Sequence, residues 1–373
     1  FDHVKPDSPE DILMGIRSGK SSYAQIFVTL CSYAGLHCKL ITGYAKGAEY
    51  VPGMHFQGRQ GQHSWNAVLV EGVWRLVDCH WAARRLIGKV ASVENVRYEL
   101  DMFYFLATPS QLIYTHYPHE QDWQLLRHPI SLQEFESLTP VKSAFFKYYL
   151  ELVTHRLAVI QGTEENIIKL AYPQELENQL SFTFTLQFED GGEEHRGTPL
   201  SRYGRQDMNP WERTATFYLR PPKSGAYKVL LYAKCLSNET NTSKSGASDA
   251  FYGAVCEYRL EARFPEQNTL PPFPPTQNSG YGPNDVSRRY ALQAFTQQPC
   301  IRAERGTLEL RFQLGSPNIR MMAKLKSSQY PEDRLARAVL QRIVAEKEAI
   351  FAVFLPDAGE FGMEVYANDS TQD

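Results

Sequence analysis

The sequence predicts an α+β protein in which a helix packs on an antiparallel sheet and β-rich modules follow. Three observations support this prediction. Apolar residues recur at helical spacing after Ser21-Ser22, two β-rich segments flank a short turn within residues 61–81, and strands alternate with turns from about residue 140 onward. With 373 residues, the chain is long enough for two or three domains, each with its own core.

A buried helix is expected after the two serines. Tyr23 and Phe27 belong to its apolar face, and serine is a favourable N-cap residue, so the N-terminus of the helix is placed at residues 20–22. A strand is expected at residues 38–44. The Gly-rich stretch that follows, residues 45–62, is long enough to border a functional site.

Residues 61–81 predict a β-hairpin whose strands are joined by a two-residue turn. Because so short a turn fixes the register, Val70 faces Val73, and counting back from this pair places His63 diagonal to Asp78 on the same face. Diagonal neighbours lie roughly 7 Å apart at the backbone, which an imidazole and a carboxylate can span. A carboxylate that orients a histidine is an arrangement that catalysis uses.

The second half of the chain contains an internal repeat. LRPPKSGAYKVLLYA at 219–233 and FLPDAGEFGMEVYA at 354–367 share a strand, a Pro-containing turn and a second strand that ends in Tyr-Ala. The repeat indicates two β-sandwich modules of similar build. The expected domains are a core at 1–140, a first β-sandwich module at 141–265, a Pro/Gly-rich linker at 266–283 and a second β-sandwich module at 284–373.

Two further segments carry predictions about local structure. DMFYFLATP, 101–109, predicts an apolar strand that Pro109 ends. Residues 331–349 contain good helix formers, although the repeat requires a strand after them. A short helix or loop is therefore expected there, with a strand from about residue 348.

Composition excludes several classes of function. A net charge of −3 argues against broad binding to nucleic acid or to an anionic membrane, and no apolar run approaches the roughly 20 residues of a membrane span. Six scattered cysteines without a CxxC pattern favour reduced thiols in a cytoplasmic protein. No cofactor is expected, and Phe1 in place of Met indicates a piece of a longer protein.

The order of the motifs resembles the transglutaminase-like superfamily. Tyr23-Ala24 with Phe27 is followed by GYAKG at 43–47, by HSWN at 63–66 and by the strand that ends in Asp78. PEDIL, FYFLATP, DWQLL with SLQEFE, and LPDAGEFGMEVYA extend the resemblance over nearly the whole chain, to the kyphoscoliosis peptidase group that includes hillarin-type proteins. This resemblance implies a papain-like, transglutaminase-type core, a Cys–His–Asp triad, and protein partners in the cytoskeleton.

The nucleophile of that triad has no counterpart in this chain. The resemblance implies that His63 is the base and Asp78 its orienting group, and that the cysteine lies three residues before Tyr23, where this chain has Lys20. No cysteine occurs in residues 1–30, and a lysine ammonium cannot perform thiol acyl transfer. Ser21 is the nearest alternative nucleophile. The residues expected to form the wall of the cleft are Trp65, Trp81 and Tyr23.

Three hypotheses about function follow. The chain is an inactive transglutaminase-like or cysteine-peptidase-like protein that acts as a protein-binding, cytoskeleton-associated scaffold, and this interpretation is preferred. Alternatively, it is an active hydrolase or acyltransferase that uses Ser21 with His63 and Asp78, or a purely structural adhesion or linker protein. The plainer interpretations are that Cys31 and Cys79 are packing thiols and that His63 only holds Asp78. His63 and His80 lack a third ligand for a metal site.

Overall fold

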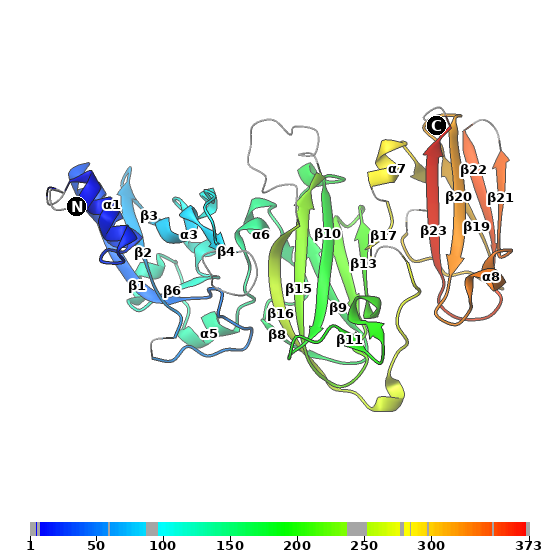
Figure 1. Ribbon diagram of the computed structural model, residues 1–373, viewed down its shortest axis with the longest axis horizontal. Helices are drawn as coiled ribbons and strands as arrows, with labels where there is room; N and C mark the ends of the chain where they lie inside the picture. Colours follow the sequence, from blue (N-terminus) through cyan, green and yellow to red (C-terminus); the bar gives the residue numbers. More distant parts are fainter. Residues whose placement is uncertain are drawn as a thin grey trace. The chain divides into compact units, whose positions relative to one another are not determined.

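The computed structural model describes residues 5, 8–58, 60–86, 96–236, 252–276, 280–283, 285–296, 298–344 and 347–370. Contacts divide the chain into two compact units (Figure 1). The first consists of Phe1–Lys147, Arg156–Val159 and Val255–Tyr258, and the second of Tyr148–His155, Ile160–Ala254 and Arg259–Asp373. The first unit combines helices with a sheet and the second is made mainly of strands, so the predicted α+β class is confirmed.

Two helices open the first unit. They are α1 (Pro9–Arg17) and α2 (Tyr23–Tyr33). The N-cap of α2 is Ser22, whose hydroxyl accepts a hydrogen bond from the Gln25 amide at 3.1 Å. Gly35 follows the helix with φ +70°, a conformation that suits a residue without a side chain. Among the described residues, no helix has both the length and the apolar character needed to cross a bilayer.

The sheet of the first unit has four strands in the order β3-β2-β1-β6. Their bounds are Cys38–Ala45 for β1, Gln62–Val70 for β2, Val73–Val77 for β3 and His116–Pro118 for β6. Val70 pairs with Val73, as the two-residue turn predicts. The Asn66 side chain donates to the carbonyl of Ala24 at 3.0 Å, which fixes the first turn of α2 against β2. Gly43 is required in β1, because a Cβ there would lie 2.1 Å from the Tyr117 carbonyl oxygen.

The remaining elements of the first unit are short. They are α3 (Cys79–Ala83), β4 (Arg85–Leu86), β5 (Val96–Arg97), η2 (Met102–Tyr104), α4 (Pro109–Leu112), η3 (Gln121–Gln124), α5 (Leu132–Ser137) and α6 (Ser143–Lys147). The prediction of a strand at 101–109 is wrong. Asp101 caps η2 through the amide of Phe103, Leu106 has a positive φ, and Pro109 begins a helix, so polar capping and turn geometry override the apolar composition.

The first β module of the second unit contains two main sheets, in the orders β10-β15-β16-β8 and β17-β13-β14-β9-β7. The strands are β7 (Glu151–Leu152), β8 (Val159–Gly162), β9 (Asn166–Ala171), β10 (Leu180–Phe188), β11 (Glu194–His195), β12 (Thr198–Pro199), β13 (Gly204–Asn209), β14 (Thr214–Leu219), β15 (Gly225–Cys235), β16 (Gly253–Ala262) and β17 (Gly280–Tyr281). Phe182, Phe184 and Leu186 alternate as buried residues of β10, the period-two burial of a strand with one face against a core.

The second β module has a four-stranded sheet, β18-β19-β22-β21, and a two-stranded sheet, β20-β23. Its elements are α7 (Asp285–Arg289), β18 (Gln293–Ala294), β19 (Thr307–Gln313), β20 (Ile319–Lys326), α8 (Glu332–Leu335), β21 (Val339–Val344), β22 (Glu348–Phe354) and β23 (Gly362–Asp369). The short helix and the strand from residue 348 agree with the sequence. Strand β21 was not predicted, because helix-forming residues conceal it.

Part of the Pro/Gly-rich stretch between the modules is packed against protein. Phe273 is only 3% exposed, and β17 pairs in parallel with β13. Residues 277–279 and 284 lie outside the described residues. Because the two compact units do not separate the two β modules, the domain boundaries at 140, 265 and 283 remain predictions.

Candidate functional site

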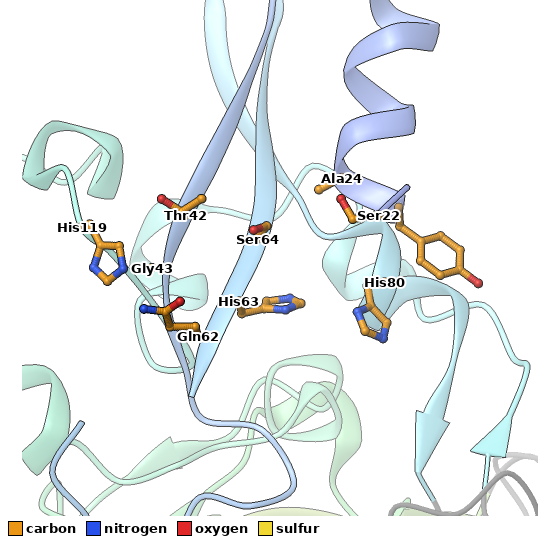
Figure 2. A pocket seen from close by; sticks show the side chains of 10 residues that line it. Ser22, Ala24, Thr42, Gly43, Gln62, His63, Ser64, His80 and His119 are labelled. Carbon is orange, nitrogen blue, oxygen red and sulfur yellow. The ribbon is translucent and has the colours of Figure 1, made fainter. Parts of the chain in front are cut away.

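A pocket of about 260 Å³ lies at the N-terminus of α2, beside one end of β1 and β2 (Figure 2). Its lining is largely polar and comes from α2, β1, β2, α3 and the segment after β6. The lining residues are Ser22, Tyr23, Ala24, Thr42, Gly43, Gln62, His63, Ser64, His80 and His119. The pocket therefore forms where the sequence places the start of the helix beside the histidine of the hairpin.

His63 and Asp78 are in direct contact. His63 Nε2 lies 2.7 Å from Asp78 Oδ2, and Asp78 is only 1% exposed. Strand β3 ends at Val77, so Asp78 is the N-cap of α3, and its Oδ1 accepts hydrogen bonds from the amides of His80 and Trp81 at 2.9 and 3.0 Å. Because Nε2 is engaged by the carboxylate, Nδ1 is the imidazole nitrogen of His63 left to act in the pocket.

A second histidine, which the sequence analysis missed, shares the same carboxylate oxygen. His116 Nε2 lies 2.9 Å from Asp78 Oδ2, and the His116 side chain is 1% exposed. Its Nδ1 lies 2.8 Å from the hydroxyl oxygen of Thr115. His116 belongs to β6 and faces Ala45 of β1, a pairing between segments about 70 residues apart. The only signal in the sequence is a histidine just before Tyr117-Pro118 at the end of an otherwise apolar stretch.

The carboxylate of this network is held ionised. Burial alone would raise the pKa of Asp78, but hydrogen bonds from His116 and His63 outweigh burial and hold that pKa well below its usual range. Burial lowers the pKa of His116, which favours its neutral form. A neutral His116 that donates from Nε2 to Asp78 has a lone pair on Nδ1, which can accept from the Thr115 hydroxyl at 2.8 Å; the competing acceptor for that proton is the Leu112 carbonyl oxygen at 3.2 Å.

His80 lies beside His63 but faces a different set of partners. Its ring stacks on Tyr23 with centroids 5.6 Å apart, and its Nε2 is hydrogen-bonded to the Arg84 guanidinium. Burial, followed by the nearby charge of Arg84, lowers the pKa of His80 to about 4. His80 is therefore neutral at pH 7.

The residues at the expected position of the nucleophile point in different directions. Lys20 is exposed and does not line the pocket. Ser21 is turned toward α1, because a Cβ on Gly15 would lie 3.1 Å from its hydroxyl oxygen. Ser22 does line the pocket, but its hydroxyl caps α2 through the Gln25 amide. The sequence analysis treated Ser22 only as a helix cap and did not place it in the pocket.

The three residues expected at the cleft wall occupy two kinds of position. Tyr23 lines the pocket. Trp65 is 1% exposed, and Trp81 has its ring centroid 5.4 Å from that of His63. Both tryptophans pack in the same core cluster. They support the His63 ring, whereas Tyr23 borders the pocket directly.

No cysteine lines the pocket within the part of the chain that the structure describes. Cys31 and Cys79 pack together with Val68 and Val77, in a cluster between α2 and the sheet. Burial raises the pKa of the Cys79 thiol to about 11, which opposes formation of a thiolate. These thiols are therefore placed as packing residues.

His63, Asp78 and His116 also present three metal-ligand atoms within 4.8 Å of one another. Two ligands of a tetrahedral zinc ion, each about 2.1 Å from the metal, lie about 3.4 Å apart. The carboxylate oxygen lies 2.7 and 2.9 Å from the two nitrogens, the separation of charge-assisted hydrogen bonds. The geometry thus fits a hydrogen-bonded network better than a metal centre.

Comparisons with known proteins agree with this fold. Residues 2–79 match the transglutaminase-like superfamily, and residues 132–273 and 288–373 match the KY-like, immunoglobulin-like domain. Hillarin of Drosophila melanogaster is 32% identical over 99% of this chain and 46% of its own length, and the kyphoscoliosis peptidase of Homo sapiens is 28% identical over 96% and 49%. Cytokinesis protein 3 of Schizosaccharomyces pombe is 24% identical over 38% of this chain and 16% of its own.

The fold and the site define a transglutaminase-like protein. The KY-like, immunoglobulin-like domain covers more than half of the chain, and the chain belongs to the family that contains hillarin and kyphoscoliosis peptidase. It spans about half the length of these two curated relatives.

Proposed function

We propose that this chain is a catalytically inactive transglutaminase-like module that serves as a protein-binding scaffold. The observation that carries the proposal is the composition of the pocket around His63. The base and its orienting carboxylate are hydrogen-bonded at 2.7 Å, but the side chain at the start of α2 that lines the pocket is a serine whose oxygen caps the helix. Acyl transfer of the thiol type requires a thiolate at such a position.

The placement of Ser21 gives no support to the alternative of an active hydrolase. Activation of a serine requires its hydroxyl within hydrogen-bonding reach of the base. The Ser21 hydroxyl faces Gly15 of α1, and Ser21 does not line the pocket that His63 lines. The His63–Asp78 pair is then a triad remnant that keeps β2 joined to α3.

The proposed partners are proteins of the cytoskeleton, and the proposed location is the cytoplasm. Support comes from the family resemblance and from a relative that is a cytokinesis protein. The β-rich second unit makes up most of the family-specific match, so we assign the binding of such partners to this unit. Neither nucleic acid nor a membrane is proposed as a partner, because the chain carries a net charge of only −3.

The test of inactivity compares the wild-type chain with His63→Ala. We expect neither incorporation of an amine into a glutamine-containing protein nor proteolysis of casein above the level of His63→Ala, because no thiol faces His63. Activity that is present in the wild type and lost in His63→Ala would refute the proposal. Pull-down of actin filaments or microtubules by the purified chain tests the scaffold role separately.

A restored thiol tests the placement of the pocket. In Ser22→Cys, the new thiol lies at the N-terminus of α2 beside His63, where helix dipole and imidazolium stabilise a thiolate. We expect iodoacetamide to alkylate this cysteine about tenfold faster than the cysteine of Lys20→Cys, as measured by peptide mass spectrometry at pH 6.5. A further His63→Ala change should remove most of this advantage. Faster labelling of Lys20→Cys would contradict the position assigned to the nucleophile.

A further inference from the structure

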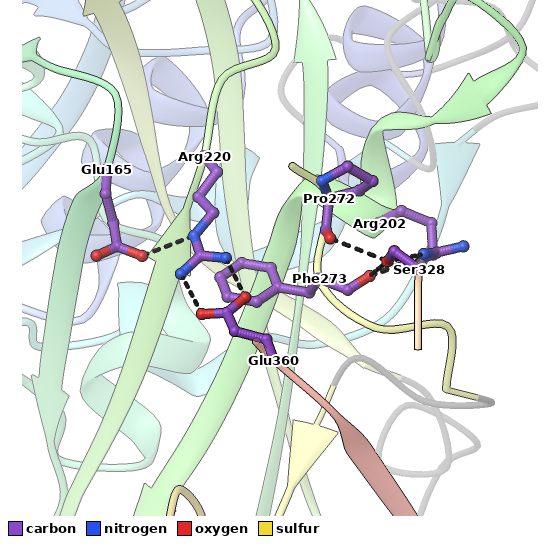
Figure 3. A network of polar contacts seen from close by, with 7 residues as sticks. All are labelled: Glu165, Arg202, Arg220, Pro272, Phe273, Ser328 and Glu360. Atoms are coloured by element: carbon purple, nitrogen blue, oxygen red, sulfur yellow. Dashed lines mark hydrogen bonds and ion pairs between the residues drawn. The ribbon is translucent and has the colours of Figure 1, made fainter. Parts of the chain in front are cut away.

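Arg220 of the second unit joins two parts of the chain that are far apart in sequence (Figure 3). It directly follows β14 of the first β module and is 8% exposed. Its Nε donates to Glu165 Oε1 at 2.8 Å, within the same module. Its two terminal nitrogens donate to the two oxygens of Glu360, at 2.5 and 2.8 Å, and Glu360 belongs to the second β module. The pair is bidentate, the strongest geometry for an arginine and a carboxylate.

The two partners occupy the two copies of the internal repeat. Arg220 is in the turn that connects β14 and β15, and Glu360 is in the turn that connects β22 and β23. The two turns occupy equivalent positions in the two copies of the repeat, at 219–233 and 354–367. Corresponding turns of two similar modules therefore meet, with an arginine on one and a glutamate on the other.

The segment between the modules is held in the same contact. The Phe273 ring lies 4.0 Å from the Arg220 guanidinium and is almost fully buried. The Arg202 side chain of the first module donates to the Phe273 carbonyl at 2.8 Å, and the Arg202 backbone carbonyl accepts from the Phe273 amide at 2.9 Å. Ser328 of the second module donates to the Pro272 carbonyl at 3.2 Å. Both modules therefore form hydrogen bonds with the segment that composition predicts to be a linker.

We propose that the two β modules and residues 270–276 form one rigid body, which is held closed by the Arg220–Glu360 pair. A free Gly-rich chain of the length of residues 266–283 has an end-to-end distance of about 23 Å and allows wide relative motion. Here, separation of the modules would break the bidentate Arg220–Glu360 pair, whose two parallel hydrogen bonds also fix how the two turns meet. A protein that contacts both modules then meets a surface with fixed geometry.

The test measures the distance between the modules in the full chain. Nitroxide labels at Glu175→Cys and Arg320→Cys, both exposed, report one position in each module, in a background with Cys300→Ser. Double electron–electron resonance should give one narrow distance distribution for this parent. Glu360→Arg and Arg220→Glu should each broaden it at least twofold. The double variant, Arg220→Glu with Glu360→Arg, should restore most of the narrow distribution because the opposite charges are exchanged.

A matched control uses an ion pair within one module. Arg259 lies 3.1 Å from Glu189, both in the first β module, so Arg259→Glu should leave the width unchanged. Because the Glu360 side chain is half exposed, Glu360→Arg is expected to leave the second module folded, which circular dichroism can verify. A broad distribution in the parent would overturn the proposal. So would a width that stays unchanged in both single variants.

Discussion

Asp78 in the first unit and Arg220 in the second are both buried charged groups held by several partners, and they differ in how far those partners are exposed to water. In the first unit, Asp78 is 1% exposed, and it accepts from two imidazoles and two backbone amides. In the second unit, Arg220 donates to two glutamates whose side chains are 37% and 50% exposed. The first network is closed to solvent except through His63, whereas the second borders water on the side of its carboxylates.

This difference gives the two networks different roles. The Asp78 network stabilises the fold of the first unit, whereas the Arg220–Glu360 pair holds two modules of the second unit together. If Asp78 is removed, His116 and the amides at the start of α3 lose their acceptor inside the protein, where water cannot replace it. If Glu360 is removed, part of the contact can be rehydrated, so the two modules can part without unfolding. The same chemistry of hydrogen-bonded ions thus maintains the fold in one unit and the mutual position of two modules in the other.

Removal of the carboxylate of Asp78 should have the largest effect on stability. Asp78→Ala is expected to lower the free energy of unfolding of the first unit by about 3–5 kcal/mol, because it leaves buried donors unpaired. Glu360→Gln, as the counterpart, should cost about 1 kcal/mol or less. Urea unfolding followed by tryptophan fluorescence reports on Asp78→Ala in the first unit, because Trp65, Trp74, Trp81 and Trp123 lie there and the remaining Trp211 is 80% exposed. For Glu360→Gln the unfolding is followed by circular dichroism, which reports the strands of the second unit. Equal costs for the two variants would remove the distinction between them.

Acid should weaken the first network before the second. Burial lowers the pKa of His80 to about 4 and also lowers that of His116, from an ordinary value of 6.5. Between pH 6.5 and 4 the unfolded state therefore binds protons that the folded state does not, and stability falls as pH falls through this window. The expected slope, discounted for the partial exposure of His80, is on the order of 1 kcal/mol per pH unit.

The Arg220–Glu360 ion pair should be lost only at lower pH. The hydrogen bond from Arg220 lowers the pKa of Glu360 below its ordinary 4.5, so the ion pair is complete above that pH and is lost only as the carboxylate becomes protonated below it. The distance distribution between the modules should thus stay narrow at pH 5, where urea unfolding already shows a weaker first unit. His80→Gln should flatten the pH dependence of the unfolding free energy of the first unit. It should leave the distance distribution between the two modules unchanged. A slope that His80→Gln does not alter would assign the acid sensitivity to other groups.

The parts of the site that the sequence could predict are those set by short-range geometry. The two-residue turn fixes the hairpin register, which brings His63 to Asp78, and the serine pair marks the start of α2. His116 could not be found in this way, because its contact with Asp78 spans 38 residues and depends on the pairing of β6 with β1. Local counting also could not show that Ser22, rather than Lys20, turns into the pocket.

The fold shows the same division between local and distant effects. The repeated strand–turn–strand pattern at 219–233 and 354–367 predicted the β modules, because it is contained in two short segments of the sequence. The burial of Phe273 was not predictable from a Pro/Gly-rich composition, since it arises only when Arg202 and Arg220 are brought to the same place. Residues 101–109 show that an apolar stretch can form turns around a buried network, because the amide of Asp78 is bonded to the carbonyl of Tyr104.

The smallest expected change in stability concerns Thr115, which contacts His116, the second histidine bound to Asp78. Thr115→Val keeps the shape of the side chain but removes the hydroxyl that lies 2.8 Å from His116 Nδ1, and should cost about 1 kcal/mol of unfolding free energy. Thr108→Val is the matched control, because that hydroxyl lies on an exposed side chain and bonds the side chain of Gln111, so a few tenths of a kcal/mol are expected.

The ring nitrogens of His116 distinguish a role in orientation from simple packing. If the Thr115 hydroxyl donates to Nδ1, the ¹⁵N spectrum of the wild type shows a proton on Nε2 and a lone pair on Nδ1. Removal of the hydroxyl should introduce the other tautomer or a charged ring, because Nδ1 then has no donor to fix it. An unchanged ¹⁵N spectrum in Thr115→Val would show that Asp78 alone sets the tautomer, which would confine the network of the first unit to the carboxylate and its two histidines.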